Sequence, residues 1–329
     1  MKKFEESYNS VYAGYIKENN ILIECTSGGI ASALAATFIE SGGYVVGVEY
    51  TEDFYDARYI ITNKMGDLKR IRGTKYISAK INNIFYDVRM VLEKGNKVLF
   101  FGLPCVIAAL IKSLEKYYDK LYTCELICHG PIANSVHVSF IKELEKKYNS
   151  KIVGFSVRSK KRKWQPPYLK AIFENGKKFE KNFYRTDYGI AFSISGRNSC
   201  YSCKYKGINH KADIMIGDYW GINKKDRFWN KLGVSVIFVK NNKGEECLKS
   251  AGKVVLFETT FDKALAKNPM VLKSKEKSEF KESFDFLFKE NGISYAIRHC
   301  MNYRSRLRLL VRLYFPKSII KFLRKVLKR

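Results

Sequence analysis

A chain of 329 residues is long enough to bury a sizeable core, as one large domain or two. Its hydrophobic content of 46% and aromatic content of 14% exclude a disordered chain. The longest apolar run, residues 98–111, contains Gly and Pro, so no membrane-spanning helix is expected. The net charge of +28 predicts an anionic ligand or partner, such as nucleic acid, anionic lipid or a phosphate- or carboxylate-rich cofactor.

The amino terminus, MKKFEESYNS, carries acids and no apolar stretch, so it does not resemble a secretory signal. Eight cysteines in a long chain without an export signal indicate reduced thiols and a cytoplasmic location.

Residues 1–20 show no clear hydrophobic period. The first motif follows them and consists of Thr26, Ser27, Gly28 and Gly29, directly before the helical pattern IASALAATFIE. A Ser-Gly-Gly turn that opens a helix leaves backbone N–H groups free for a phosphate. Alternatively, Ser27 is a plain N-cap and the two glycines form a tight turn.

Strands are expected over residues 44–50 and 58–62, and a helix near 82–93. Between them lies a basic, glycine-containing turn, which is either an anion site or an ordinary solvated loop. Its residues are Arg72, Gly73, Thr74, Lys75 and Tyr76.

Two apolar, strand-like runs end at turns that carry cysteines, Cys105 and Cys128. If both strands are parallel, both thiols lie at the carboxyl edge of one sheet, where α/β proteins bind ligands. Cys200 and Cys203 form a Cys-x-x-Cys pair in a later loop. Four thiolates suit an iron–sulfur cluster or a structural zinc. The alternatives are a redox pair at 200/203 and buried core cysteines at 105 and 128.

From residue 151 the pattern changes to strands at 151–159 and 168–184, the latter containing the hairpin signal Asn175-Gly176. The basic loop SKKRKWQPP before that hairpin is either a solvated loop or a cover for an acidic ligand. The sequence therefore predicts an α/β fold with a mostly parallel central sheet and flanking helices, an added antiparallel hairpin region and a helical C-terminus. We expect an α/β domain at 1–260, a helical segment at 261–300 and a basic amphipathic tail at 301–329.

The tail, residues 304–329, contains ten basic residues and no acid, with Leu, Ile and Phe at helical spacing and a break at Pro316. This pairing is typical of an interfacial helix that holds a protein at the inner face of a membrane. A helix docked on an acidic partner and a solvated extension are equally compatible with it.

Six short motifs together resemble the coenzyme F420 hydrogenase/dehydrogenase beta-subunit family, over roughly residues 22 to 275. In chain order they are Ser-Gly-Gly-Ile (27–30), Arg-Gly-Thr-Lys-Tyr (72–76), Gly-Leu-Pro-Cys (102–105), Cys-His-Gly (128–130), Cys-Tyr-Ser-Cys-Lys (200–204) and Gly-Asp-Tyr-Trp-Gly (217–221).

The resemblance implies an oxidoreductase with FAD and an iron–sulfur cluster, which passes electrons between the cluster and a hydride carrier. It implies a [4Fe–4S] cluster on Cys105, Cys128, Cys200 and Cys203. It also places the 26–29 loop and the 72–76 turn along the flavin, with Gly217, Asp218 and Trp220 near the site. The expected partners are an electron carrier such as a ferredoxin and an anionic coenzyme or substrate, with no nucleic acid.

Two departures from the family are visible. Leu103 stands where the family often has Thr, and the ferredoxin-like segment that begins many members is absent, so a separate electron partner is expected. Stand-alone members also occur in bacteria without the deazaflavin coenzyme, often near polysaccharide-synthesis enzymes, and polysaccharide biosynthesis is therefore an alternative setting.

His129, beside Cys128, is the candidate catalytic residue, as a proton relay to reduced flavin, although a structural turn histidine is the simpler interpretation. Two other classes of function remain open. One is a basic nucleic-acid-binding protein with a structural zinc. The other is a cofactor-free scaffold of the same fold.

Overall fold

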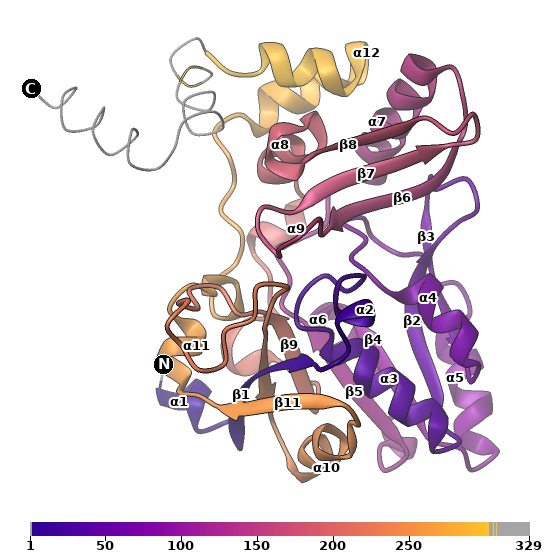
Figure 1. Cartoon of the computed structure of the whole chain (residues 1–329), viewed down its shortest axis with the longest axis vertical. Helices are drawn as coiled ribbons and strands as arrows, with labels where there is room; N and C mark the ends of the chain where they lie inside the picture. The colour runs from indigo at the N-terminus through magenta and orange to yellow at the C-terminus, as the bar shows by residue number, and fades with distance from the viewer. Residues whose placement is uncertain (1, 303–304, 306, 308–329) are drawn as a thin grey trace, which may run out of the picture.

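The computed structural model describes residues 2–302, 305 and 307. The chain forms two separate sheets, a large one in the lower part of Figure 1 and a small one in the upper part. The larger sheet has eight strands, and from edge to edge they are β11 (Val254–Glu258), β1 (Ser10–Ile16), β10 (Ser235–Val239), β9 (Ile214–Asp218), β5 (Leu121–Leu126), β4 (Val98–Gly102), β2 (Tyr44–Tyr50) and β3 (Ala57–Thr62).

The four central strands β2, β4, β5 and β9 are parallel, and antiparallel strands flank them on both sides. Strand β4 is buried along its whole length, which explains its unbroken apolar sequence VLFFG. The predicted α/β class with a mostly parallel sheet centre is thus confirmed.

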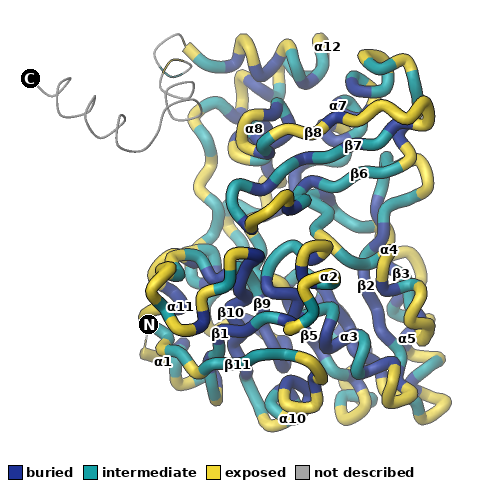
Figure 2. The backbone as a smooth tube through the Cα atoms, viewed as in Figure 1, coloured by how far each residue is buried: buried dark blue, intermediate teal, exposed yellow. Residues whose placement is uncertain are grey.

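Helices cover both faces of the large sheet and bury its apolar side chains (Figure 2). One face packs against α3 (Ile30–Glu40), α4 (Leu68–Ile71) and α10 (Asn242–Ser250). The other face packs against α5 (Ile84–Glu93) and α6 (Pro104–Ser113) at one end, and against α1 (Lys2–Glu5) and α11 (Phe261–Leu265) at the other.

The smaller, antiparallel sheet is inserted between β5 and β9. Its strands are β6 (Ile152–Ser159), β7 (Tyr168–Phe173) and β8 (Lys178–Asn182). The helices α7 (Asn134–Tyr148), α8 (Asp187–Ile194) and α12 (Lys281–His299) share one apolar core with this sheet. The chain therefore leaves the large sheet just before Cys128 and returns to it through the loop that carries Cys200 and Cys203, which includes the short α9 (Asn198–Tyr201).

Several details differ from the sequence-based expectations. Residues 1–20 contain strand β1, and the region 261–300 is helical over α11, a single 3₁₀ turn at Pro269–Val271 and α12, with 272–280 outside helices. No helix among the described residues is both long and apolar enough to cross a membrane. The predicted interfacial helix at 304–329 lies almost entirely outside the described residues.

Candidate functional site

The four candidate cysteines gather at the carboxyl edge of the parallel strands. Cys105 lies in the first turn of α6, three residues beyond the end of β4, and Cys128 lies two residues beyond the end of β5. The backbone N–H of Gly130 donates to Cys128 Sγ at 3.2 Å. A Cβ atom placed on Gly130 would stand 3.3 Å from Cys200 Sγ, so the Cys128 turn and the Cys-x-x-Cys loop are in direct contact.

The electrostatics of the thiols also reflect this grouping. Burial raises the pKa of Cys105, and the Cys203 and Cys200 thiolates raise it further. The pKa of Cys128 is raised to about 11, mainly by burial and to a smaller extent by Cys105 and Cys200. The Gly130 N–H and the Lys206 ammonium act in the opposite direction. Each of the four thiols is thus within electrostatic reach of at least one other. Cys105 is the exposed member of the group.

The remaining cysteines, Cys25, Cys124, Cys247 and Cys300, are buried in the core, as expected of structural residues. Within residues 2–302, no three Cys, His, Asp or Glu side chains are close enough together to hold a single metal ion.

The 26–29 loop lies at the same edge, before the amino terminus of α3. Gly28 is enclosed: its N–H donates to Ser235 Oγ at 3.0 Å, and its carbonyl accepts from Ile16 N at 2.8 Å. A Cβ atom on Gly28 would stand 2.2 Å from Gly14 O. The expectation that the Gly28 N–H is free for a phosphate is therefore wrong, because this glycine is needed to pack the loop against β1 and β10.

The 72–76 turn is joined to that loop, since the hydroxyls of Thr26 and Thr74 lie 2.9 Å apart. Lys75 is directed inward, where its Nζ donates to Arg70 O and Arg72 O. Burial lowers the pKa of Lys75 to about 7. Tyr76 packs on Phe192 with ring centroids 4.3 Å apart, so the turn spans the space between the two sheets. Gly73 is exposed, with open space around its Cα.

Sequence analysis did not identify Arg158 as a site residue. This arginine, at the end of β6, forms a buried ion pair with Asp218 at the carboxyl end of β9, with Nη1 2.6 Å from Oδ2. Its guanidinium also lies over the Trp220 ring, which stacks on Trp164 at 5.1 Å. Two features of the sequence pointed to this cluster. They are the Gly-Asp-Tyr-Trp-Gly motif, which contains Asp218 and Trp220, and the basic loop, which contains Trp164.

Lys160, in that basic loop, is only 8% exposed. Its Nζ donates to Ser27 O at 2.7 Å and to Leu22 O at 2.8 Å, and burial lowers its pKa to about 8. Its neighbours Lys161, Arg162 and Lys163 are exposed. The solvated-loop interpretation therefore holds for these three residues, and a cover for an acidic ligand stays a prediction.

Buried N–H donors without a hydrogen-bond partner among the residues that the structure describes include Arg72 Nε, Arg158 Nη2 and Trp164 Nε1. A buried donor without an acceptor costs about 1–3 kcal/mol. Arg72 and Arg158 are paired with Glu24 and Asp218, whereas Lys160 beside them has no carboxylate partner in the described part of the chain. These groups form a donor-rich wall near the 26–29 loop, which suits a ligand that carries acceptor oxygens.

His129 lies between this wall and the cysteines. Its imidazole is exposed on one side, yet the enclosed remainder and the Lys206 ammonium lower its pKa, while Asp218 acts in the opposite direction. The ring is consequently neutral near pH 7.

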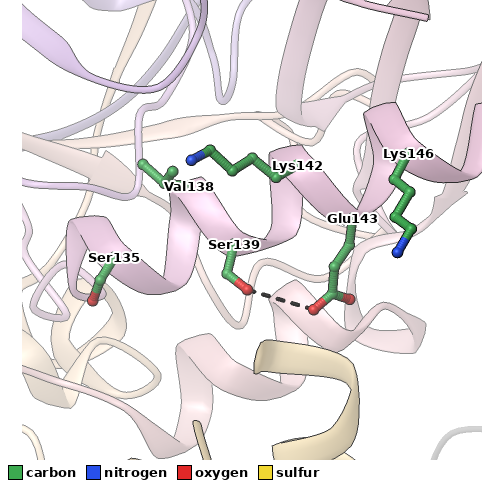
Figure 3. Close-up of a pocket in the computed structure, with 6 residues that line it drawn as sticks. All are labelled: Ser135, Val138, Ser139, Lys142, Glu143 and Lys146. Carbon is green, nitrogen blue, oxygen red and sulfur yellow. Dashed lines mark hydrogen bonds between the residues drawn. The ribbon is translucent and has the colours of Figure 1, made fainter. Parts of the chain in front are cut away.

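Figure 3 shows a different feature, an open pocket of about 520 Å³ along α7, where Ser139 Oγ donates to Glu143 at 3.4 Å. It is lined by residues of α7 and contains none of the candidate residues.

Two family models match this chain, and together they span most of it. The model described as coenzyme F420 hydrogenase/dehydrogenase, beta subunit N-term, matches residues 11–85, and the corresponding C-terminus model matches residues 95–262. The chain belongs to the coenzyme F420 hydrogenase/dehydrogenase beta-subunit family. This is a family of oxidoreductases, and its two matched segments include the 26–29 loop, the 72–76 turn and all four candidate cysteines.

Among solved structures, the fold is similar to a chain of the F420-reducing [NiFe] hydrogenase complex from Methanosarcina barkeri, studied by xenon derivatization. The TM-score is 0.54 at 17% sequence identity, over 85% of this chain and 94% of that chain. At this identity the likeness shows the fold. No curated protein matches the chain.

Proposed function

We propose that this member of the beta-subunit family is a flavin- and iron–sulfur-dependent oxidoreductase. Cys105, Cys128, Cys200 and Cys203 would hold a [4Fe–4S] cluster, and FAD would lie along the 26–29 loop and the 72–76 turn. The observation that carries the proposal is the gathering of these four thiols, from three separate segments, at the same sheet edge as the donor-rich wall.

The thiols fit an iron–sulfur cluster in their chemistry. The raised pKa values keep the thiols of Cys105 and Cys128 protonated near pH 7, and the neighbouring cysteines contribute to both increases. In a cluster held by the four sulfurs, iron would take the place of those protons and would offset the repulsion between the thiolates. Gly130 N–H, already directed at Cys128 Sγ, supplies the kind of hydrogen bond that tunes a cluster.

The donor-rich wall fits a flavin dinucleotide. Its phosphates carry the acceptor oxygens that Arg72 Nε, Arg158 Nη2 and Trp164 Nε1 lack, and their charge complements Lys160. Gly28 contributes by packing, while the open amino terminus of α3, which begins after Gly29, offers further N–H groups.

A bound flavin can accept a hydride as two electrons and pass them singly to a cluster. The protein's own groups orient the reactants and handle the proton. The ion pair between Arg158 and Asp218 would hold the two sheets in place beside the site. The imidazole of His129, which is neutral near pH 7, would act as the proton relay.

The proposed hydride carrier is an anionic coenzyme or substrate. The two candidates are coenzyme F420 and a carboxylate- or phosphate-bearing substrate of polysaccharide biosynthesis. The proposed electron partner is a separate carrier protein such as a ferredoxin. The positive charge of the chain is compatible with each of them.

Anaerobic purification followed by absorbance spectroscopy and metal analysis tests this proposal. We expect flavin bands on a broad brown absorbance, with iron and FAD both recovered from the protein. A colourless protein containing zinc would favour the nucleic-acid-binding alternative. A protein that binds neither iron nor FAD after anaerobic reconstitution would contradict the proposal and favour the scaffold.

A further inference from the structure

Residues 270–275, which we call the strap, lie along the segment that follows Cys200. In the sequence they come after residue 262, where the family-model matches end. Lys206 Nζ donates to Met270 O, His210 Nε2 lies 3.0 Å from Val271 O, and Cys203 N donates to Ser274 Oγ at 3.0 Å. The strap is therefore bound to the Cys-x-x-Cys segment at three points.

The last residue of the strap, Lys275, lies beside two of the thiols. A Cβ atom on Gly130 would stand 3.9 Å from Lys275 Cδ and 3.3 Å from Cys200 Sγ, and Gly130 N–H donates to Cys128 Sγ. Lys275, Cys200 and Cys128 thus surround the same glycine. Lys275 Nζ is fixed by Phe192 O at 2.7 Å and Ser195 O at 3.2 Å.

A second cation, Lys206, is fixed on the other side of the Cys128 turn. Its Nζ donates to Cys128 O at 2.7 Å. Both ammonium groups are held by backbone carbonyls, and no carboxylate forms an ion pair with either of them within residues 2–302. Both charges lie within electrostatic reach of the thiols, that of Lys206 acting on Cys128 and that of Lys275 on Cys200 and Cys128, and no carboxylate among the described residues pairs with either of them.

Adding one electron to a cluster adds one negative charge. A fixed cation close by stabilises the reduced form more than the oxidised form, and it does so strongly where water is excluded. We propose that Lys206 and Lys275 raise the reduction potential of the cluster held by the four cysteines. This inference rests on the proposed function, because it needs the cluster to be present.

Redox titration of the anaerobic holoprotein with dithionite, followed by electron paramagnetic resonance, tests the inference. Lys275→Gln and Lys206→Gln each remove a charge and keep an N–H donor for the carbonyls. At the wild-type midpoint potential, we expect each variant to hold about tenfold less reduced cluster relative to oxidised cluster. For one electron, that is a midpoint about 59 mV lower.

Lys275→Arg keeps the charge and should keep the wild-type midpoint. Lys273→Gln is the matched control, since Lys273 belongs to the same strap but is exposed, and water screens its charge. Loss of the cluster from Lys275→Gln with retention in Lys275→Arg would also support the charge requirement.

The inference would be overturned if both Gln variants had the same midpoint potential as Lys273→Gln. It would also be overturned if Lys275→Gln and Lys275→Arg both lost the cluster, because Lys275 would then have a packing role. Failure of the wild-type protein to bind iron at all would instead contradict the proposed function.

Discussion

Arg158 and Asp218 form an ion pair that joins the small sheet to the large one, with Nη1 2.6 Å from Oδ2 and each side chain only 8% exposed. Burial lowers the pKa of Arg158, but the Asp218 carboxylate and the Tyr76 and Tyr184 hydroxyls together raise it above its usual value. Arg158 therefore remains charged in the interior, at the point where β6 meets the end of β9.

Removing one partner of this pair should destabilise the protein strongly. Arg158→Met leaves the Asp218 charge buried and uncompensated, a change that typically costs about 3–5 kcal/mol. Urea unfolding of the cofactor-free protein measures the loss. The double variant Arg158→Met/Asp218→Leu should recover most of it, because no buried charge remains.

The control for this experiment is the exposed ion pair between Lys253 and Glu18, whose side chains are 72% and 32% exposed. Lys253→Met should change the unfolding free energy by about 0–1 kcal/mol. An Arg158→Met variant no less stable than Lys253→Met would show that the interior pair does not hold the sheets together.

Gly28 should tolerate no side chain, for a reason of packing. A Cβ atom there would stand 2.2 Å from Gly14 O and 2.5 Å from Ser235 N, and both are backbone atoms that cannot move aside alone. Gly28→Ala should therefore lower the unfolding free energy by about 1–3 kcal/mol or more. Gly66→Ala is the matched control, since nothing lies within 4 Å of its Cβ position. Equal stability of the two variants would refute the packing role.

Lys160 should make stability depend on pH in the alkaline range. Its pKa falls from 10.5 to about 8 on folding, so the folded state holds this proton less tightly than the unfolded state. The resulting penalty is fully present below about pH 8 and is relieved as the pH rises toward 10.5. It is on the order of 3 kcal/mol, at 1.36 kcal/mol for each pKa unit.

This dependence is measured as the difference in unfolding free energy between the cofactor-free wild type and Lys160→Met. The wild type should gain stability relative to the variant between pH 8 and 10.5. Lys161→Met, which changes an exposed neighbour, should run parallel to the wild type. A constant difference between wild type and Lys160→Met over that range would show that the Lys160 pKa is not lowered.

Local sequence patterns were sufficient to predict the parallel centre of the sheet and the edge at which the cysteines gather. Strands β4 and β5 are short apolar runs ended by turns, with Cys105 directly after the first turn and Cys128 directly before the second. The hairpin of β7 and β8 was likewise predicted from Asn175-Gly176.

Strand β1 was not predicted, because its residues alternate poorly. It lies between β10 and β11 in the sheet and is buried at Val11, Ala13, Gly14 and Ile16, on both faces, so no period of two survives. Tyr12, between two of these buried residues, is half-buried and donates its hydroxyl proton to Glu245.

The contacts within the site could not be predicted, because they join distant segments. Arg158 and Asp218 are 60 residues apart, and Ser274 is 71 residues from Cys203. Neither Lys160 nor Lys275 differs in sequence from the many exposed lysines of the chain. Only the folded structure separates those that are enclosed and directed at the site.

Iron content and the electron paramagnetic resonance spectrum of single Cys→Ser variants test the central claim most directly. Anaerobically reconstituted wild type should bind about four irons per chain and give a [4Fe–4S] signal on reduction. Ser at position 105, 128, 200 or 203 should lower the iron content and alter the signal, while Cys247→Ser, a change in the core, should preserve both. Full iron content with an unchanged signal in any of the four site variants would contradict the four-cysteine cluster.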